Sequence, residues 1–227
     1  MRSFIFSLAV ALALPSVVSA ASPRPWLALN GSWGTYSMSD VNADIRNVNA
    51  SLAGSGLAMD EVNHGLGFGV TVGVEIPSRV SLGLGYERLG ASSEVGDASG
   101  SLQYKLPANV VRGMVEYRFP TEQAFAPSVG FGLGLVKEAG AIEITQTGAG
   151  AAAFDLHGSG PLLETIVGGD WWATPQFALT GSAGYRYAKV REIKVLGQTA
   201  VNPDGSKYTV DYSGVVVRLG CKAAFAR

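Results

Sequence analysis

Nine charged side chains of both signs recur at alternate positions of successive predicted strands, so that they share one face of the sheet. Charges enclosed in a narrow barrel must pair, because an unpaired buried charge is costly. The set therefore predicts an interior network of ion pairs and hydrogen bonds. A path for ions or small solutes is the alternative, since glycines on the same face leave space. The nine residues are Glu75, Glu87, Arg112, Glu116, Glu164, Asp170, Arg186, Arg218 and Lys222.

A second group has the residue types of nucleophilic catalysis. His157 and Ser159 lie in the segment LHGSG, and Glu164 follows. A histidine base that activates a serine is the arrangement of acyl hydrolases. The spacing is not specific, however, and both histidines, His64 and His157, fall in predicted loops, where we expect solvated side chains. We therefore predict no catalytic residues.

No metal or cofactor site is predicted either. The sequence has no cluster of cysteine and histidine with zinc-ligand spacing. Its G-x-G repeats alternate along predicted strands and do not precede a helix, so they are not a dinucleotide fingerprint. The single cysteine, Cys221, cannot form an intramolecular disulfide and fits a small apolar strand position.

The stretch from Gly65 to Arg88 shows the pattern that positions these charges. It contains two alternating runs, GLGFGVTVGVE and VSLGLGYER, separated by IPSR. Period-two alternation around a short break that contains proline predicts a β-hairpin. One face is large and apolar, whereas the other is almost only glycine, which packs poorly on a soluble surface. The pattern is typical of a membrane barrel whose bulky face meets lipid.

The composition favours the same class. Hydrophobic residues make up 47% of the 227 residues and charged residues 15%, against roughly 25% charged in soluble domains. Beyond the N-terminal segment, no stretch approaches the ~20 apolar residues of a membrane helix, which leaves a closed β-barrel as the spanning structure. The net charge is −1 and no basic cluster stands out in the sequence, so no nucleic-acid partner is expected.

The N-terminus has the features of a secretory signal. Arg2 precedes a short apolar core from Phe4 to Leu14, and Val18-Ser19-Ala20 fits the small-x-small cleavage rule. We expect residues 1–20 to be a cleaved signal peptide and residues 21–227 to form the barrel domain.

Eight strands are predicted, and the links after the second, fourth and sixth are short whereas the others are long. Outer-membrane barrels have short periplasmic turns and long extracellular loops. The prediction is an all-β, eight-stranded, up-and-down antiparallel transmembrane barrel. The strands cover about 26–37, 65–75, 80–88, 102–119, 126–137, 161–172, 177–190 and 208–225, with Pro107 interrupting the fourth. Aromatic residues expected at the membrane interfaces are Trp26, Trp33, Tyr86, Trp171, Tyr185 and Tyr187.

The first long link contains a predicted helix over residues 40–53, with Asp40 as its N-cap and Gly54 as its stop. We expect this helix to rest on the barrel rim. An interfacial or partner-binding helix is less favoured, because Arg46 is its only basic residue. The prediction depends on an apolar stripe at helical spacing, made by Val41, Ile45, Val48 and Leu52.

Three segments carry a resemblance to a known family: the hairpin GFGVTVGVE–PSR–VSLGLGYERL, the strand GFGLGL and the closing strand YSGVVVRLG. They resemble the small outer-membrane β-barrel proteins, such as the transmembrane domain of outer membrane protein A and the opacity-type surface proteins. The resemblance covers essentially the whole mature chain. It implies the cell outer membrane as location and outer-membrane lipid as partner.

The resemblance leaves the function open, because the family hosts porins, adhesins, structural proteins and enzymes. We expect a monomer with a structural or surface-interaction role, whose long extracellular loops could meet a ligand or surface partner. A narrow pore or small-solute carrier is the first alternative. A lipid A- or phospholipid-modifying enzyme is the second, and a soluble lipocalin-like barrel with apolar residues inside is the third.

Overall fold

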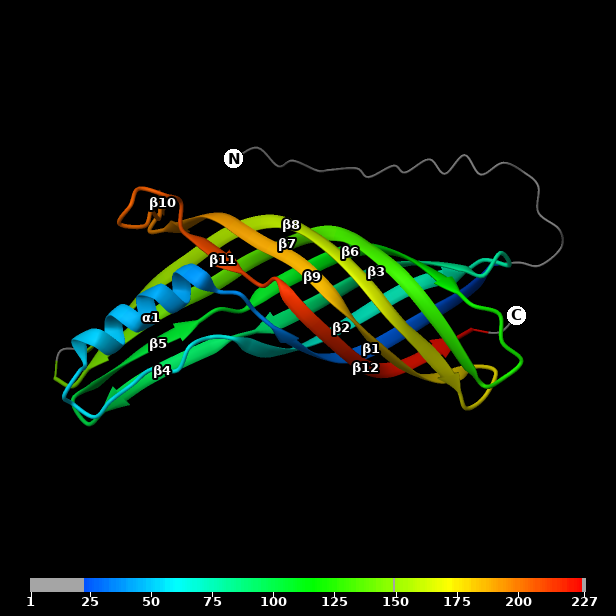
Figure 1. Ribbon diagram of the computed structural model, residues 1–227, viewed down its shortest axis with the longest axis horizontal. Helices are drawn as coiled ribbons and strands as arrows, with labels where there is room; N and C mark the ends of the chain where they lie inside the picture. Colours follow the sequence, from blue (N-terminus) through cyan, green and yellow to red (C-terminus); the bar gives the residue numbers. More distant parts are fainter. Residues whose placement is uncertain (1–22, 149, 226–227) are drawn as a thin grey trace.

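The computed structural model describes residues 23–148 and 150–225. The predicted signal peptide lies outside the described residues. The strand pairings form an antiparallel ring of eight strands, and this ring is the body of the protein (Figure 1). The ring consists of β1 (Arg24–Thr35), β2 (His64–Glu75), β3 (Val80–Gly90), β6 (Ala108–Arg118), β7 (Phe125–Gln146), β8 (Gly150–Trp172), β9 (Phe177–Val195) and β12 (Gly214–Ala224).

Each strand of the ring pairs with the next one along the chain, and β12 pairs with β1. The pairing closes the sheet, so the ring has no free edge. The predicted all-β barrel is confirmed. Short turns join β2 to β3, β6 to β7 and β8 to β9, and in Figure 1 they lie opposite the end that carries the helix.

The β2–β3 hairpin shows which of its two alternating faces points out of the barrel. Leu66 is 70% exposed and Phe68 63% exposed, whereas Gly65 and Gly69, on the other face, are buried. The bulky apolar face therefore points outward, as lipid requires. A lipocalin-like barrel would bury these side chains, so that alternative is wrong.

Several predicted loops contain further strands. The stretch 89–101, expected to be a solvated loop, continues β3 to Gly90 and forms a hairpin of β4 (Ser92–Asp97) and β5 (Gly100–Lys105). Pro107 separates β5 from β6, and both pair with β7, so β5 is a separate strand. In place of the predicted 138–160 loop, β7 and β8 continue as paired strands and form a long hairpin. Two short strands, β10 (Gln198–Thr199) and β11 (Thr209–Asp211), pair with β9.

The predicted helix is present as α1 (Ser39–Ser51). Its N-cap is Met38, in the left-handed region at φ 41°, and not Asp40. Asp40 lies in the first turn, where its carboxylate accepts a hydrogen bond from the backbone N–H of Thr209 at 2.9 Å. Burial and the neighbouring carboxylate of Asp44 raise the pKa of Tyr208, whose hydroxyl donates to Asp44 at 2.8 Å. These bonds attach α1 to the segment around β11.

α1 forms part of the wall at this end of the molecule, and it does not merely rest on the rim as predicted. β1 and β2 stop where Thr35 pairs with His64, whereas β7, β8 and β9 continue further. The helix lies in the resulting gap, between β11 and the β4–β5 hairpin (Figure 1). Asn42 and Asn49 each exchange two hydrogen bonds with backbone of the segment 59–62.

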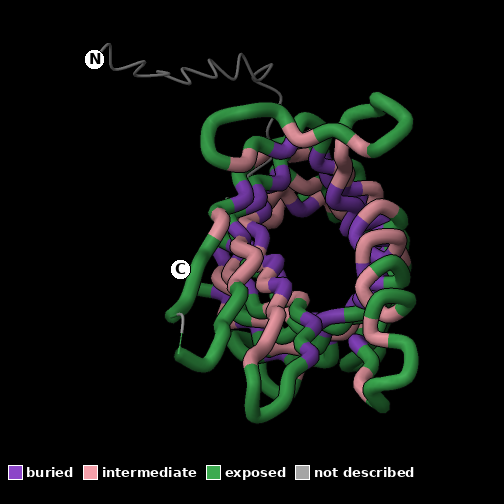
Figure 2. Tube along the Cα trace, turned by 90° about the vertical axis from the view of Figure 1, so that its left-hand side faces the viewer, coloured by how far each residue is buried: buried purple, intermediate pink, exposed green. Residues whose placement is uncertain are grey.

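The apolar stripe of α1 faces a hydrophobic core inside the ring, which we call the apolar core. Val41 and Ile45 are 1% and 0% exposed and belong to it. Buried positions line the inner side of the strands in the view along the barrel (Figure 2). Tyr212 donates through its hydroxyl to the carbonyl of Leu106 at 3.0 Å and to Glu138. Other members of the apolar core are Tyr36, Met38, Leu89, Val110, Val136, Leu162 and Val190.

Candidate functional site

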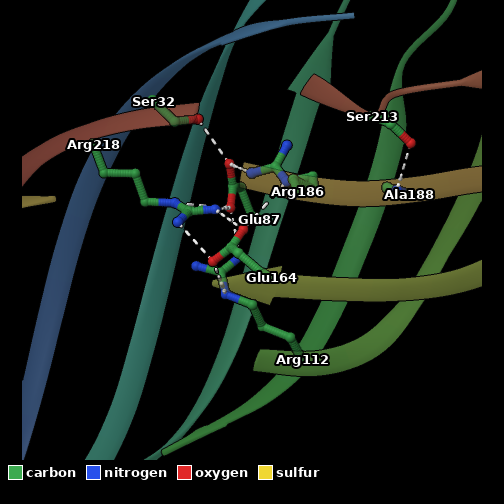
Figure 3. A network of polar contacts seen from close by, with 8 residues as sticks. All are labelled: Ser32, Glu87, Arg112, Glu164, Arg186, Ala188, Ser213 and Arg218. Atoms are coloured by element: carbon green, nitrogen blue, oxygen red, sulfur yellow. Dashed lines mark hydrogen bonds and ion pairs between the residues drawn. The ribbon is translucent and has the colours of Figure 1, made fainter. Parts of the chain in front are cut away.

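Glu87 is the centre of a charged network inside the barrel (Figure 3). It projects inward from β3 and is fully buried. Arg186 donates to its Oε1 at 2.7 Å and Arg218 to its Oε2 at 2.8 Å, and Arg112 also pairs with Oε2. The hydroxyl of Ser32 adds a fourth donor at 2.7 Å. Alternation brings these side chains inward, and closure of the ring brings them together.

Glu164 on β8 is the second carboxylate of this network. Arg218 donates from Nη1 to Oε1 at 2.8 Å and from Nη2 to Oε2 at 2.6 Å, a two-pronged contact. Arg186 adds a bond from Nε at 3.3 Å, and Arg112 lies 3.8 Å from Oε1. Arg112, Arg186 and Glu164 are each 2% exposed. Three guanidinium groups are thus held by two carboxylates.

A second cluster lies nearer the short turns. Asp170 on β8 pairs with Lys222 at 2.9 Å and with Arg118 at 3.0 Å, and Arg118 also pairs with Glu75. Glu116 lines the cavity beside this cluster. It makes none of the ion pairs found among residues 23–148 and 150–225.

Arg118 was missing from the predicted set, although its position on the same face of β6 as Arg112 and Glu116 could have revealed it. With Arg118 included, the two clusters and the adjoining Glu116 contain equal numbers of cations and carboxylates. The five carboxylates are Glu75, Glu87, Glu116, Glu164 and Asp170, and the five cations are Arg112, Arg118, Arg186, Arg218 and Lys222.

Trp26 corrects one prediction, because its ring lies inside the barrel and not at the lipid interface. The residue is 5% exposed, its Nε1 donates to Ser81 at 3.0 Å, and the Nζ of Lys222 lies 4.2 Å from the ring centroid. The reason is strand alternation: Leu29 and Trp33 face outward, so the even-numbered positions of β1 face inward. The ring borders a cavity of about 70 Å³ between the two charged clusters.

The other five predicted interface aromatics point outward. Four are exposed. Tyr187 is half-buried and lies on the same outer face of β9 as the exposed Tyr185. Their position relative to the membrane interfaces stays a prediction. The four exposed residues are Trp33, Tyr86, Trp171 and Tyr185.

The hydrolase group does not assemble. His157 and Ser159 lie in β8 and not in a loop, and both are on its outer face. Glu164 is buried on the inner face of the same strand, because it stands an odd number of residues away from both. His64 is the first residue of β2 and is exposed. The three residues therefore do not share one site.

No group of metal-binding side chains occurs in the described part of the chain. Among the same residues, no helix has the length and apolar character needed to cross a membrane.

Comparison with known proteins agrees with this architecture. No curated protein sequence matches the chain. Neisserial surface protein A is similar in structure, with 14% sequence identity and a TM-score of 0.54, over 90% of this chain and 100% of that protein. A major outer membrane protein from Thermus thermophilus has 14% identity and a TM-score of 0.49, over 88% of this chain and 99% of that protein.

A family model described as the outer membrane protein beta-barrel domain matches residues 4–227. The match spans nearly the whole chain and confirms the family resemblance of the hairpin and closing strands. Lipid is accordingly the environment of the barrel wall. The chain thus belongs to the outer membrane protein beta-barrel domain family, and it is located in the cell outer membrane.

Proposed function

We propose that this protein is a closed, monomeric barrel with a structural or surface-interaction role, and that its interior is plugged by its own side chains. In this proposal, the end that carries α1, the β4–β5 hairpin and β10 is extracellular. Residues 1–20 are a cleaved signal peptide, and residues 21–227 form the mature barrel domain.

The observation that carries the proposal is the set of ion pairs that cross the lumen. In the ring, Glu87 on β3 is separated from Arg218 on β12 by β1 and β2, yet the two side chains are hydrogen-bonded. The buried guanidinium groups occupy the space that the inward glycines leave. An eight-stranded barrel has an interior just wide enough for side chains, so such a network leaves little room for solvent.

Two further features support a closed interior. The apolar core fills the α1 end with fully buried side chains, including Val110 and Val136. The cavity beside Trp26 has a volume of about 70 Å³, whereas small-molecule pockets have roughly 300–1,000 Å³. Neither feature favours the narrow pore or solute carrier.

Planar-bilayer recording tests the closed interior. We expect the purified barrel to give no unitary currents under conditions in which a porin of known conductance does. Reproducible unitary currents from the wild-type protein would overturn the plugged barrel in favour of the narrow pore.

Cysteine labelling on intact cells tests the orientation. In a C221S background, Ala98→Cys places a thiol in the β4–β5 turn and Thr121→Cys places one in the β6–β7 turn, both at exposed positions. A membrane-impermeant maleimide should label the first in intact cells and the second only after permeabilisation. The reverse pattern would contradict the proposed orientation. Sequencing the purified protein should give Ala21 as the first residue, and a start at Met1 would contradict the signal peptide.

A further inference from the structure

A row of basic residues crosses the outer wall on five adjacent strands. Arg88, Asn109, Lys137, Ser159 and Arg191 are consecutive partners in the β3–β6, β6–β7, β7–β8 and β8–β9 pairings. The three charged members are exposed, and all five stand at outward-facing positions of their strands. We call these five residues the basic row.

The spacing of the row suits a single anionic group. Neighbouring strands lie about 4.8 Å apart, which puts Lys137 about 10 Å from the backbone of each arginine. The long, flexible side chains can converge over the gaps between them. Asn109 and Ser159 stand in these gaps and offer additional hydrogen-bond donors.

The charges of the row are not neutralised by the protein. Arg88, Lys137 and Arg191 take part in no ion pair among residues 23–148 and 150–225. Three other exposed cations at the same end have carboxylate partners, whereas the exposed Lys194 on β9 makes no ion pair among the described residues. These pairs are Arg46–Glu61, Lys105–Glu143 and Lys207–Glu192.

The row stands at the border of the lipid-facing wall that is nearer the end carrying α1. Two residues closer to the short turns, the outward positions carry the exposed Tyr86 on β3, Val111 on β6 and Leu135 on β7. The equivalent positions of β8 and β9 carry Pro161 and Lys189, and Lys189 pairs with Asp211. The hydroxyl of Tyr86 donates to Asn109 at 2.6 Å and so connects the wall to the row. On β2, the partner of Arg88 is Phe68, so the basic character is confined to one side of the barrel.

We propose that the basic row binds the phosphate groups of an anionic lipid headgroup, with the acyl chains of the same lipid on the apolar wall below. Arginine and lysine are the side chains that recognise phosphate, and a cation at a membrane surface attracts anionic lipid. The apolar wall directly beneath Arg88, Asn109 and Lys137 favours a phosphate attached to acyl chains over a free anion. Placing this lipid in the outer leaflet depends on the proposed orientation.

The binding site is tested by native mass spectrometry of the purified barrel in neutral detergent with EDTA, which removes divalent cations that could bridge charges. The probes are lipid A that carries both phosphates, its dephosphorylated form, and inorganic phosphate as a competitor. The variant R88Q/K137Q/R191Q removes the three cations. The matched control R46Q/K105Q/K207Q removes the same charge from cations that already have carboxylate partners.

We expect the wild-type protein and the control to retain phosphorylated lipid A, and the triple variant to bind it at least about tenfold more weakly. The charge-conserving variant R88K/K137R/R191K should bind within about threefold of wild type, since each position keeps a cation. If the triple variant does not yield folded protein, K137Q alone should still weaken binding measurably.

Four results would overturn the proposal. They are unchanged binding by the triple variant, an equal loss in the control, equal binding of dephosphorylated lipid A, and displacement of lipid A by millimolar inorganic phosphate. Because the measurement is made in detergent, its outcome depends neither on conductance nor on orientation. A failure here is therefore distinct from a failure of the proposed closed barrel.

Discussion

Arg218 on β12 and Glu87 on β3 meet across the lumen, with Nη2 of the arginine 2.8 Å from Oε2 of the glutamate. The same guanidinium holds Glu164 on β8 through two hydrogen bonds. Arg218 therefore connects three strands, of which no two are neighbours in the ring. The contact ties opposite walls together, which backbone pairing between adjacent strands cannot do.

Replacing Glu87 with alanine should strongly destabilise the barrel. The substitution leaves Arg112, Arg186 and Arg218 around the single carboxylate of Glu164, and breaking a buried charge pair costs about 3–5 kcal/mol. Urea unfolding of the reconstituted protein, followed by intrinsic fluorescence, measures the change. Glu94→Ala is the control, since Glu94 is exposed on β4 and contacts Gln103. Equal unfolding midpoints for E87A and wild type would show that the network does not stabilise the fold.

The sequence predicts which side chains of the barrel strands face outward or inward better than it predicts the contacts between side chains inside the barrel. Lipid on one side and a narrow lumen on the other force each spanning strand to alternate, so the outward and inward faces of β2 and β3 could be predicted from residue types. The same rule places Trp26 inside the barrel, whereas its aromatic character alone predicts the membrane interface, and that prediction is wrong.

Outside the membrane the constraint is weaker. In the proposed orientation β4 and β5 project beyond the membrane, where no lipid forces apolar residues onto their outer face. The segment SSEVGDASGS therefore has the composition of a loop although it forms a hairpin. The partners of Glu87 were also beyond prediction. They come from β6, β9 and β12, and only the closed ring brings these strands around one carboxylate.

Gly69→Leu should impair folding, because Gly69 faces the lumen. A Cβ at this position would lie 2.7 Å from the carbonyl oxygen of Tyr86 and 3.2 Å from Oδ1 of Asn30. Gly113→Leu is the matched control on the outer face, where the nearest atom to the added Cβ is 4.0 Å away. The folded fraction after refolding into detergent, measured by gel mobility without heating, should fall for G69L and not for G113L. A G69L protein that folds like wild type would contradict the inward placement of this glycine face.

Ile45→Asp should loosen α1 and the end of the barrel that it helps to enclose. Ile45 is 0% exposed within the apolar core, and a carboxylate there would have to be buried without a partner or leave the core. We expect faster cleavage within residues 36–63 by a protease at a concentration that leaves the wild type intact. Asn47→Asp adds the same side chain at an exposed position of the helix and should leave the cleavage rate unchanged. Equal resistance of I45D and wild type would mean that the helix does not depend on this contact.

Quenching by brominated acyl chains should distinguish the tryptophans by the side of the wall on which they lie. Trp33 and Trp171 are 43% and 50% exposed on the outer face, where bromine atoms in the lipid can approach the indole ring. Trp26 is inside the barrel, hydrogen-bonded to Ser81 and in contact with Lys222. In vesicles of brominated lipid, the double variant W33F/W171F should lose most of the quenching that the wild type shows. W26F should increase the quenched fraction of the remaining emission, since it removes a protected fluorophore. A decrease in that fraction on W26F would place the Trp26 ring against lipid and restore the interface assignment.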